Sequence, residues 1–326
     1  MTSMLPIVAI ATGDPAGIGP EISLKTALSA EVRALCRPLL VGDPDVVARQ
    51  AKACGIGTDI RVIENVADMN GGVPLLAVRA PDAAEIAFGQ NGAASGRASL
   101  AAASRAIKSA LAGEVAAVVA APQNQTSIKL AGIDFDGYPS FVARETGLAP
   151  DYVYLMLCFG DYKIVHCTLH QSVRQAIDAI TRERVGHVIA VANRTLKRLG
   201  IKEPRIAVGG LNPHAGEDGL FGREEIEIIR PEIDEAKRAG VRVEGPFGAD
   251  TMFHKKDIDA FIVMLHDQGH ITAKLLARNA TAGLAIGSPI LFSSVAHGSG
   301  HDIAGKGIAD PAAMIEAVTR LAKAGG

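Results

Sequence analysis

The stretch FIVMLHDQGHITAK (261–274) decides the fold class. It opens with five apolar residues, Phe261–Leu265, and then changes at once to polar and titratable groups between His266 and His270. A short continuous apolar run of this kind is typical of a strand buried on both faces, as in parallel sheets covered by helices. Lys274 follows one helical turn further on. The stretch therefore predicts a buried strand that passes into a helix, with titratable groups at the junction.

The same alternation of strand and helix continues outward along the chain. Strands are predicted at 6–12, 37–42, 114–122 and 205–210, and helices from about residue 20 and at 95–113, 182–199 and 222–239. This order favours an α/β fold with a mostly parallel sheet. The segments 153–158 and 163–169, separated by the turn-forming residues FGDY, predict an antiparallel hairpin instead.

The length of 326 residues, with 48% hydrophobic, favours two domains. Strand and helix patterns place the crossings near residues 125 and 280. We therefore expect a first α/β domain of residues 1–125 with 280–326. The second α/β domain would comprise residues 126–279.

Composition argues against several classes of partner. The net charge is −2, tryptophan is absent and aromatic residues are 4%, so nucleic acid and anionic membrane are poor expectations. No apolar run is long enough to span a membrane, and the first residues lack the pattern of a signal peptide. The cysteines, which have no CxxC spacing, are expected to be reduced thiols of a cytoplasmic protein.

Histidines gather where predicted strands end. His170, His214, His266 and His270 all follow apolar strand patterns. Ligands of open α/β sheets bind beyond the carboxyl ends of the strands, so these side chains are candidates for one site. Three imidazoles with an open coordination position would suit zinc or a similar divalent ion. For each histidine alone, a hydrogen-bonded loop residue is the alternative, and the wide sequence spacing leaves both open.

Three further groups are candidates for proton transfer. Asp250 lies in GPFGADTMF, Asp267 is adjacent to His266, and Lys274 lies on the helix predicted after HDQG. A nearby cation would lower the pKa of the lysine ammonium and fit it for moving protons. The alternatives are a helix-capping role for either aspartate and a solvated lysine.

Two glycine-rich stretches could hold a ligand through their backbone. In AHGSGHDIAGKGIADP (296–311), small residues allow close approach of a flat ligand, and Asp302 could accept hydrogen bonds from ribose hydroxyls. GDPAGIGPE (13–21) lies at a predicted strand–helix junction, where either a tight turn or an anion site is consistent with the pattern. Composition alone leaves both stretches open.

Residues 297–311 resemble the cofactor loop of the isocitrate and isopropylmalate dehydrogenases. The resemblance implies a two-domain isocitrate/isopropylmalate dehydrogenase-like fold, with mostly parallel sheets and a central cleft. It also implies that His297, Gly298, Ser299 and Asp302 contact the adenosine part of a nicotinamide cofactor. An aspartate at the ribose would repel a 2′-phosphate, so NAD is expected rather than NADP.

Four motifs, GDPAGIGPEI, LNPHAGE, GPFGADTMF and LHDQGH, resemble in that order the signatures of the 4-hydroxythreonine-4-phosphate dehydrogenases, over nearly the whole chain. The resemblance implies that His170, His214 and His266 bind one divalent ion, with zinc expected and iron, manganese or magnesium as alternatives. It implies that Lys274 is the active-site lysine. It also implies a homodimer in which the second subunit completes each active site.

The chain departs from that family where a phosphate would bind. Gly137-Tyr138-Pro139 stands in place of GHT, Gly283 and Phe292 in place of Asn and Arg, and Pro122–Gln125 in place of PxHK. A phosphate needs charge-assisted donors, and apolar replacements leave it unpaired. The expected phosphate pocket is therefore missing.

One branch of the family resembles the chain in these regions as well. The terephthalate dihydrodiol dehydrogenases, which act on 1,2-dihydroxy-3,5-cyclohexadiene-1,4-dicarboxylate, share stretches such as GYPS, TLHQSVR and MLHDQGHITAKLL. Tyr138 and Phe292 would suit the flat ring of such a substrate. Arg174 would pair with a carboxylate, with a structural salt bridge as the alternative.

The expected activity is metal-dependent, NAD-linked oxidation and decarboxylation of this diol to protocatechuate. One alternative is 4-hydroxythreonine 4-phosphate, or a related 4-phosphorylated sugar acid, as substrate. A second is a non-catalytic metal- or metabolite-binding protein of the same fold. Lys274, the three candidate ligands and the cofactor loop together favour an enzyme.

Overall fold

The chain forms two compact units that divide later in the sequence than the expected crossings. The computed structural model describes residues 5–277 and 282–325. One unit comprises Met1–Leu148 with Ser288–Gly326, and the other comprises Ala149–Gly287. The crossings expected near 125 and 280 compare with divisions after residues 148 and 287, and residue 280 itself lies outside the described residues.

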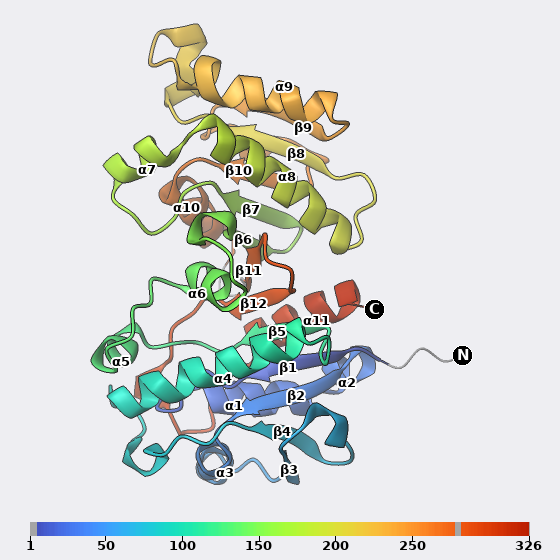
Figure 1. Cartoon of the computed structure of the whole chain (residues 1–326), viewed down its shortest axis with the longest axis vertical. Helices are drawn as coiled ribbons and strands as arrows, with labels where there is room; N and C mark the ends of the chain where they lie inside the picture. The colour runs from blue at the N-terminus through green and yellow to red at the C-terminus, as the bar shows by residue number, and fades with distance from the viewer. Residues whose placement is uncertain (1–4, 278–281, 326) are drawn as a thin grey trace. The chain divides into compact units, whose positions relative to one another are not determined.

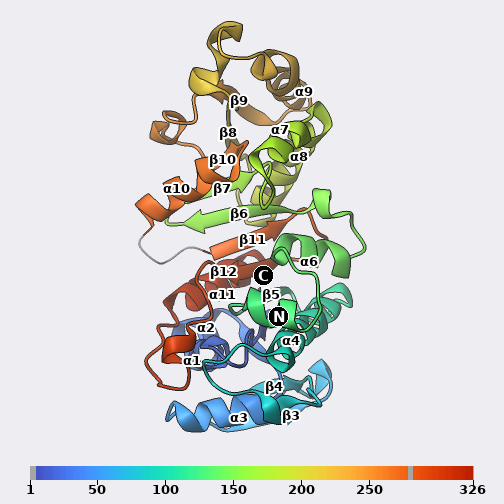
Figure 2. The same cartoon turned by 90° about the vertical axis from the view of Figure 1, so that its left-hand side faces the viewer.

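The first unit is built on a parallel sheet with the strand order β3-β4-β2-β1-β5-β12. Figures 1 and 2 show α4 on one face of this sheet and α1 and α11 on the other. The strands are β1 Ile7–Ala11, β2 Arg37–Gly42, β3 Ile60–Ile63, β4 Val73–Ala77, β5 Ala117–Ala120 and β12 Phe292–Val295. The helices are α1 Gly19–Leu28, α2 Ala30–Leu35, α3 Pro44–Ala53, α4 Ala93–Leu111, α5 Gln125–Leu130, α6 Tyr138–Glu145 and α11 Ala312–Gly325.

The strands of the second unit follow the order β11-β6-β7-β10-β8-β9. They include the predicted hairpin, formed by β6 and β7. β6 pairs antiparallel with β7 and with β11, whereas β7, β10, β8 and β9 run parallel. Figure 2 shows α10 on one face and α8 and α9 on the other. The strands are β6 Tyr154–Phe159, β7 Tyr162–His166, β8 Arg205–Gly209, β9 Arg242–Phe247, β10 Ala260–Val263 and β11 Ala282–Ile286, and the helices are α7 Val173–Ala179, α8 Arg182–Arg198, α9 Arg230–Arg238 and α10 His266–Leu276. The predicted α/β class is confirmed.

The strand-to-helix junction at residues 261–274 forms as its pattern predicts. All four residues of β10 are buried, and Phe261 packs in a cluster with Ile164 and Val263. The helix begins at His266, where the side chain of Gln268 turns back and its Oε1 accepts hydrogen bonds from the backbone N–H groups of Met264 and Leu265. These bonds satisfy two backbone N–H groups at the point where the strand ends.

Local sequence signals explain other element boundaries. Asp43 caps α3, its Oδ1 accepting from the backbone N–H groups of Asp45 and Val46. In the glycine-rich turn after β1, a Cβ atom on Gly17 would lie 2.3 Å from the carbonyl oxygen of Ser299. Only glycine fits this contact, because any side chain would clash with the backbone of Ser299. This agrees with the interpretation of GDPAGIGPE as a tight turn.

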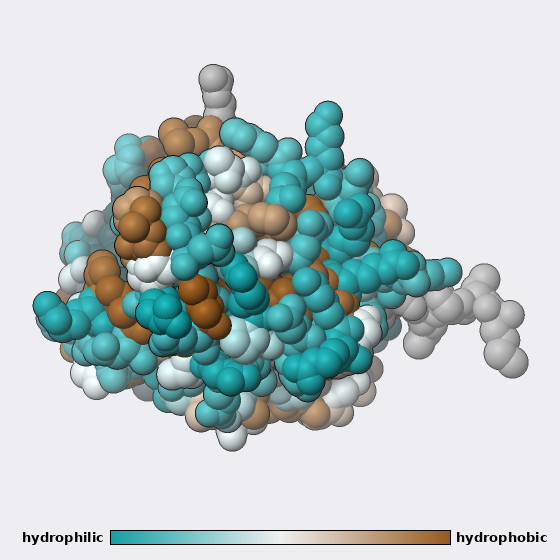
Figure 3. Space-filling view, turned by 90° about the horizontal axis from the view of Figure 1, so that it is seen from above, coloured by the Kyte–Doolittle hydropathy of each residue, from teal (hydrophilic) through white to brown (hydrophobic). Residues whose placement is uncertain are grey.

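One end of the second unit is largely polar. Figure 3 shows the face at its α9 end, where hydrophilic side chains predominate and hydrophobic groups are small and separate. None of the described helices combines the length and apolar character that crossing a membrane requires.

Candidate active site

Four neighbouring parallel strands of the second unit deliver candidate site residues to one edge of the sheet. β7, β10, β8 and β9 are adjacent and run parallel, so their carboxyl ends share that edge. Beyond these ends lie, in the same order, His170, His266, His214 and Asp250. The histidines were considered together because each was expected to follow a strand of a parallel sheet. The sheet topology confirms that the strands before them are adjacent and parallel.

His170 and His266 are close neighbours at this edge. Their ring centroids are 5.5 Å apart. The carboxylate of Asp267, which can only accept, takes a hydrogen bond from Nδ1 of His266 at 2.7 Å. This bond leaves Nε2 of His266 as the atom available to a metal ion. Asp267 thus corresponds to the carboxylate that commonly orients a metal-binding histidine.

His214 lies on an unusual left-handed turn after β8. Five consecutive residues, 214–218, have φ between 43° and 81°, and four of them are not glycine. Left-handed non-glycine residues cost about 1–2 kcal/mol each, so surrounding contacts must hold the turn in place. Such concentrated backbone strain is typical of functional segments.

A buried carboxylate supports the start of that turn. Glu225 is 1% exposed. Its Oε1 accepts hydrogen bonds from the backbone N–H groups of Leu211 at 2.7 Å and Asn212 at 2.8 Å, and its Oε2 accepts from the Asn212 side chain. Glu225 therefore positions the backbone that leads to His214. Sequence reasoning missed it, because an acidic residue in a charged helix pattern carries no sign of burial.

Gln268 connects the two histidine-bearing segments. Its Nε2 donates a hydrogen bond to the carbonyl oxygen of Gly210 at 3.1 Å, while its Oε1 holds the start of α10. Asp250 also lies near the turn, since the hypothetical Cβ of Gly248 would be 2.7 Å from Asp250 Oδ1 and 3.6 Å from the Cα of His214. Asp250 caps no helix, because the short helix after it, Met252–His254, has no side-chain cap. Hydrogen bonds and close contacts therefore connect the loops at this edge of the sheet.

The side chains at this edge are of a chemical type that binds borderline divalent ions. Imidazole nitrogens from His170 and His266, with His214 on the adjoining loop, are ligands that zinc, iron and manganese accept. Within the ranges 5–277 and 282–325, however, no group of three or more His, Cys, Asp or Glu side chains is already arranged to hold a metal. Lys274 is exposed on α10, two turns beyond His266.

Two further histidines pack behind His266. The rings of His266 and His270 stack in parallel with centroids 3.8 Å apart, and His166 lies 4.6 Å from His270. His166 is 1% exposed, so it is a core residue, and burial, with a smaller effect of His270, lowers its pKa to about 3. Its Nε2 has no hydrogen-bond partner in the described part of the chain. His166 is therefore neutral at ordinary pH and supports the ring stack.

The depressed pKa of His166 predicts acid sensitivity in the metal-free protein. The unfolded chain binds a proton at this histidine below about pH 6.5, whereas the folded chain does not until about pH 3. Because of this group, the free energy of unfolding should therefore decrease as the pH falls from about 6.5 toward 3. Urea unfolding of His166→Asn should show a flatter pH profile than wild type. An unchanged slope, with the exposed His254→Asn as control, would contradict this.

The candidate cofactor loop of the first unit is partly buried. Gly298 and Asp302 are exposed, and no heavy atom lies within 4 Å of a Cβ placed on Gly298. Ser299 is 8% exposed, and its carbonyl oxygen accepts from the backbone N–H of Ile18 at 2.8 Å. His297 is half-buried. The loop leaves room for a ligand at Gly298 and Asp302, whereas Ser299 anchors it to the turn after β1.

A buried carboxylate locks the other end of this loop. Asp14 is 1% exposed, and its Oδ2 accepts a hydrogen bond from Nε2 of His301 at 2.7 Å. Its Oδ1 accepts from the backbone N–H of Ala16 at 3.0 Å and from the hydroxyl of Ser95. Asp14 and His301 were both within motifs that sequence reasoning quoted, but their pairing depends on segments 287 residues apart.

Comparison with known proteins identifies the family. The family model described as "Pyridoxal phosphate biosynthetic protein PdxA" matches residues 34–321. The chain belongs to the PdxA family. The resemblance inferred from the four motifs is thereby confirmed, and with it the assignment as an oxidoreductase of the dehydrogenase type.

Relatives of this PdxA-family chain carry two kinds of name. A 1,2-dihydroxy-3,5-cyclohexadiene-1,4-dicarboxylate dehydrogenase from Comamonas sp is 39% identical, covering 96% of each chain. A putative D-threonate 4-phosphate dehydrogenase from Symbiobacterium thermophilum is 40% identical, covering 98% of this chain and 96% of the relative. A crystal structure of a 4-hydroxythreonine-4-phosphate dehydrogenase from Burkholderia phymatum has a TM-score of 0.85 at 36% identity and covers 99% of both chains. Identity alone therefore does not separate the two substrate classes.

The expected substrate contacts of this PdxA-family chain lie in different environments. The Tyr138 hydroxyl accepts from Gln123 Nε2 at 2.5 Å and donates to the carbonyl oxygen of Ala121 at 3.2 Å, and burial raises its pKa. The ring of Phe292 packs 4.9 Å from that of Tyr138 and is 1% exposed. Phe292 was expected to face a flat substrate, but its burial means that it supports Tyr138 instead. Arg174, at the start of α7, is exposed and forms no ion pair with any described residue, so the alternative structural salt bridge is not formed.

Proposed function

We propose that this PdxA-family dehydrogenase uses NAD and one divalent metal ion to oxidise and decarboxylate a cyclic diol dicarboxylate, 1,2-dihydroxy-3,5-cyclohexadiene-1,4-dicarboxylate, to protocatechuate. The observation that carries the proposal is the environment of Tyr138. Tyr138 lies in the stretch where the phosphate-binding members have GHT. Its ring packs against that of Phe292, and its hydroxyl is hydrogen-bonded to Gln123 and to the carbonyl oxygen of Ala121. Gln123, Ala121 and Phe292, these three partners of Tyr138, carry no positive charge that could pair with a phosphate. The relative from Comamonas, which bears the name of this activity, supports the same substrate.

In this proposal the metal would be held by His170, His214 and His266, and it would supply Lewis-acid polarisation of the hydroxyl oxygen and of the carbonyl formed from it. Asp267 accepts a hydrogen bond from Nδ1 of His266, so Nε2 of that ring would be the atom that binds the ion. Gln268 and Glu225 keep the two ligand-bearing segments in register. Zinc is the proposed ion, with iron, manganese and magnesium as alternatives.

Proton transfer and substrate orientation fall to other side chains of the second unit. Lys274, exposed on α10, would take the proton of the hydroxyl that is oxidised and later return a proton to the enolate oxygen left when carbon dioxide departs, with Asp250 or Asp267 as a relay. Arg174 forms no ion pair with any residue in the ranges 5–277 and 282–325, and it would bind a substrate carboxylate in a bidentate manner. Loss of carbon dioxide from the β-keto acid then restores aromaticity.

The substrate assignment is tested by NAD reduction at equal metal loading. The diol dicarboxylate should be turned over, and 4-hydroxythreonine 4-phosphate and D-threonate 4-phosphate should not. Arg174→Met should raise KM for the diol and leave KM for NAD unchanged. Turnover of a phosphate compound alone would establish the alternative that the Symbiobacterium relative suggests. Metal and NAD binding without turnover of any of the three would point to a binding protein.

The cofactor assignment rests on Asp302 in the loop after β12. Its carboxylate is exposed and would accept hydrogen bonds from the ribose hydroxyls of NAD. Asp302→Ala should weaken NADH binding, measured by NADH fluorescence, by about tenfold and raise KM for NAD more than KM for substrate. Asp310→Ala, an exposed aspartate that caps α11, is the control. Equal changes in both KM values would count against the ribose contact.

We also propose that the protein is a homodimer with a shared active site. Support comes from α10, where Ile271, Leu275 and Leu276 are 57%, 78% and 54% exposed next to the candidate metal ligand His266. Exposed apolar clusters of this kind are typical of interfaces. Sedimentation velocity should give a dimer, and Leu275→Glu should shift it toward monomer with loss of activity. A wild-type monomer that is fully active would refute the shared site.

A further inference from the structure

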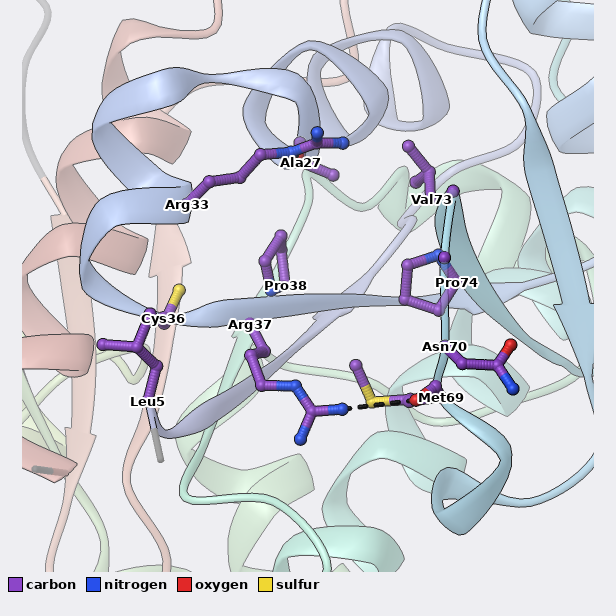
Figure 4. Close-up of a pocket in the computed structure, with 12 residues that line it drawn as sticks. Leu5, Ala27, Arg33, Cys36, Arg37, Pro38, Met69, Asn70, Val73 and Pro74 are labelled. Carbon is purple, nitrogen blue, oxygen red and sulfur yellow. Dashed lines mark hydrogen bonds between the residues drawn. The ribbon is translucent and has the colours of Figure 1, made fainter. Parts of the chain in front are cut away.

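The first unit contains a cavity of about 300 Å³ at the edge of its sheet opposite the cofactor loop (Figure 4). Its lining includes Arg37 and Pro38, which begin β2, and Val73 and Pro74, which begin β4. Because these strands run parallel with β1 and β12, their first residues lie at the edge away from the loops that follow β1 and β12. The cavity is therefore separate from the proposed dinucleotide site.

Two arginines line this cavity, and each makes a hydrogen bond to a backbone carbonyl. Nε of Arg33, on α2, donates a hydrogen bond to the carbonyl oxygen of Ala27 at 2.8 Å. A terminal nitrogen of Arg37 reaches the carbonyl oxygen of Met69 at 3.4 Å. Neither guanidinium forms an ion pair with an acidic residue in the described ranges, and each keeps further N–H groups for other acceptors.

The remaining lining is mostly apolar. Figure 4 shows the two guanidiniums on opposite sides of Pro38 and Pro74. Ala27 and Val73 extend this apolar wall, and Asn70 adds one amide. Lined in this way, the cavity has a cation at each side and an apolar strip between them.

Charged side chains of both signs lie just outside the residues that line the cavity. The carboxylate of Asp59 lies close to Gly72, where a Cβ would be 3.0 Å from its Oδ2. Arg61 lies near Gly71 on the same loop, at 3.9 Å from a Cβ placed there. The residues that line the cavity include two arginines and no acidic side chain, so an anionic occupant is favoured.

We propose that this cavity binds a small organic dicarboxylate, with one carboxylate at Arg33, the other at Arg37 and an apolar body against Pro38 and Pro74. The volume is at the lower end for ligand pockets, which suits a single ring and excludes a dinucleotide. Fixed guanidiniums bind carboxylates through paired hydrogen bonds. The site takes no part in hydride transfer and does not depend on the proposed activity.

The test uses the full-length, metal-free protein with terephthalate as probe. Met69 contributes to the lining, so its ε-methyl group, observed after carbon-13 methionine labelling, reports on this cavity alone. Terephthalate should shift that resonance saturably. Benzoate, with one carboxylate, should bind about tenfold more weakly, and so should inorganic phosphate, because neither spans both arginines.

Variants separate this site from any other that binds the probe. Arg33→Gln and Arg37→Gln should each weaken the affinity at least about tenfold, whereas Arg79→Gln, an exposed arginine paired with Glu64, should not. Circular dichroism verifies folding, and Arg37→Lys should retain part of the affinity. The proposal is overturned if the Met69 resonance does not respond, if phosphate binds as tightly as terephthalate, or if neither arginine variant changes the affinity.

Discussion

Replacing His266 with alanine should abolish tight binding of one divalent ion and reduce turnover to background. Removal of an outer carboxylate from a metal-binding histidine already costs about 10- to 100-fold in affinity or activity, so loss of the ligand itself should cost more. His266 has its Nδ1 hydrogen-bonded to Asp267, which leaves Nε2 for the ion. Metal content after dialysis and initial rates of NAD reduction measure the two effects.

Two controls sharpen this prediction. Asp267→Asn should give the intermediate loss, because it removes only the orienting charge. His254→Ala changes an exposed histidine of the same unit and should bind metal normally. Undiminished metal affinity in His266→Ala would refute the metal assignment, whereas lost metal with normal turnover would refute a metal role in the reaction.

Replacing Asp14 with alanine should destabilise the protein by about 1–3 kcal/mol, as expected when buried donors lose their hydrogen-bond acceptor. Asp14 is 1% exposed and accepts hydrogen bonds from His301, Ala16 and Ser95. All three donors would lose their acceptor in a site with little access to water. Urea unfolding, followed by circular dichroism because the chain has no tryptophan, measures the change.

The same lock should affect the cofactor loop. Asp14→Asn keeps the shape of the side chain and should lose less stability than Asp14→Ala, while weakening NADH binding through a looser His301. Asp45→Ala, an exposed aspartate at the start of α3, should change stability by less than about 0.5 kcal/mol. A similar loss in Asp45→Ala and Asp14→Ala would show that the buried pair has no special role.

The elements that sequence reasoning predicted are those with strong local signals. Continuous apolar runs such as Phe261–Leu265 identify buried strands, Asp43 shows the start of a helix, and FGDY indicates a hairpin turn. In each, the deciding interactions lie within a few residues. The ends of the strands were therefore accessible, and with them the shared sheet edge beyond which His170, His214 and His266 lie.

The supporting residues were not accessible in this way. Glu225 and Asp14 act through backbone and side-chain partners that only the tertiary structure brings near. Phe292 illustrates the reverse error, since an aromatic residue suits a substrate pocket and a core equally well, and only its 1% exposure decides. A sequence reports the type of a side chain, but its partners follow from the packing of distant segments.

The left-handed turn at 214–218 limits how this motif can be reused. Its geometry is imposed from outside, by Glu225 and by the Gln268 link to Gly210. A grafted NPHAGE segment in another scaffold would relax to an ordinary right-handed turn and direct its histidine elsewhere. Anyone engineering this centre must therefore move the loop, the buried glutamate and the helix-start glutamine as one cassette.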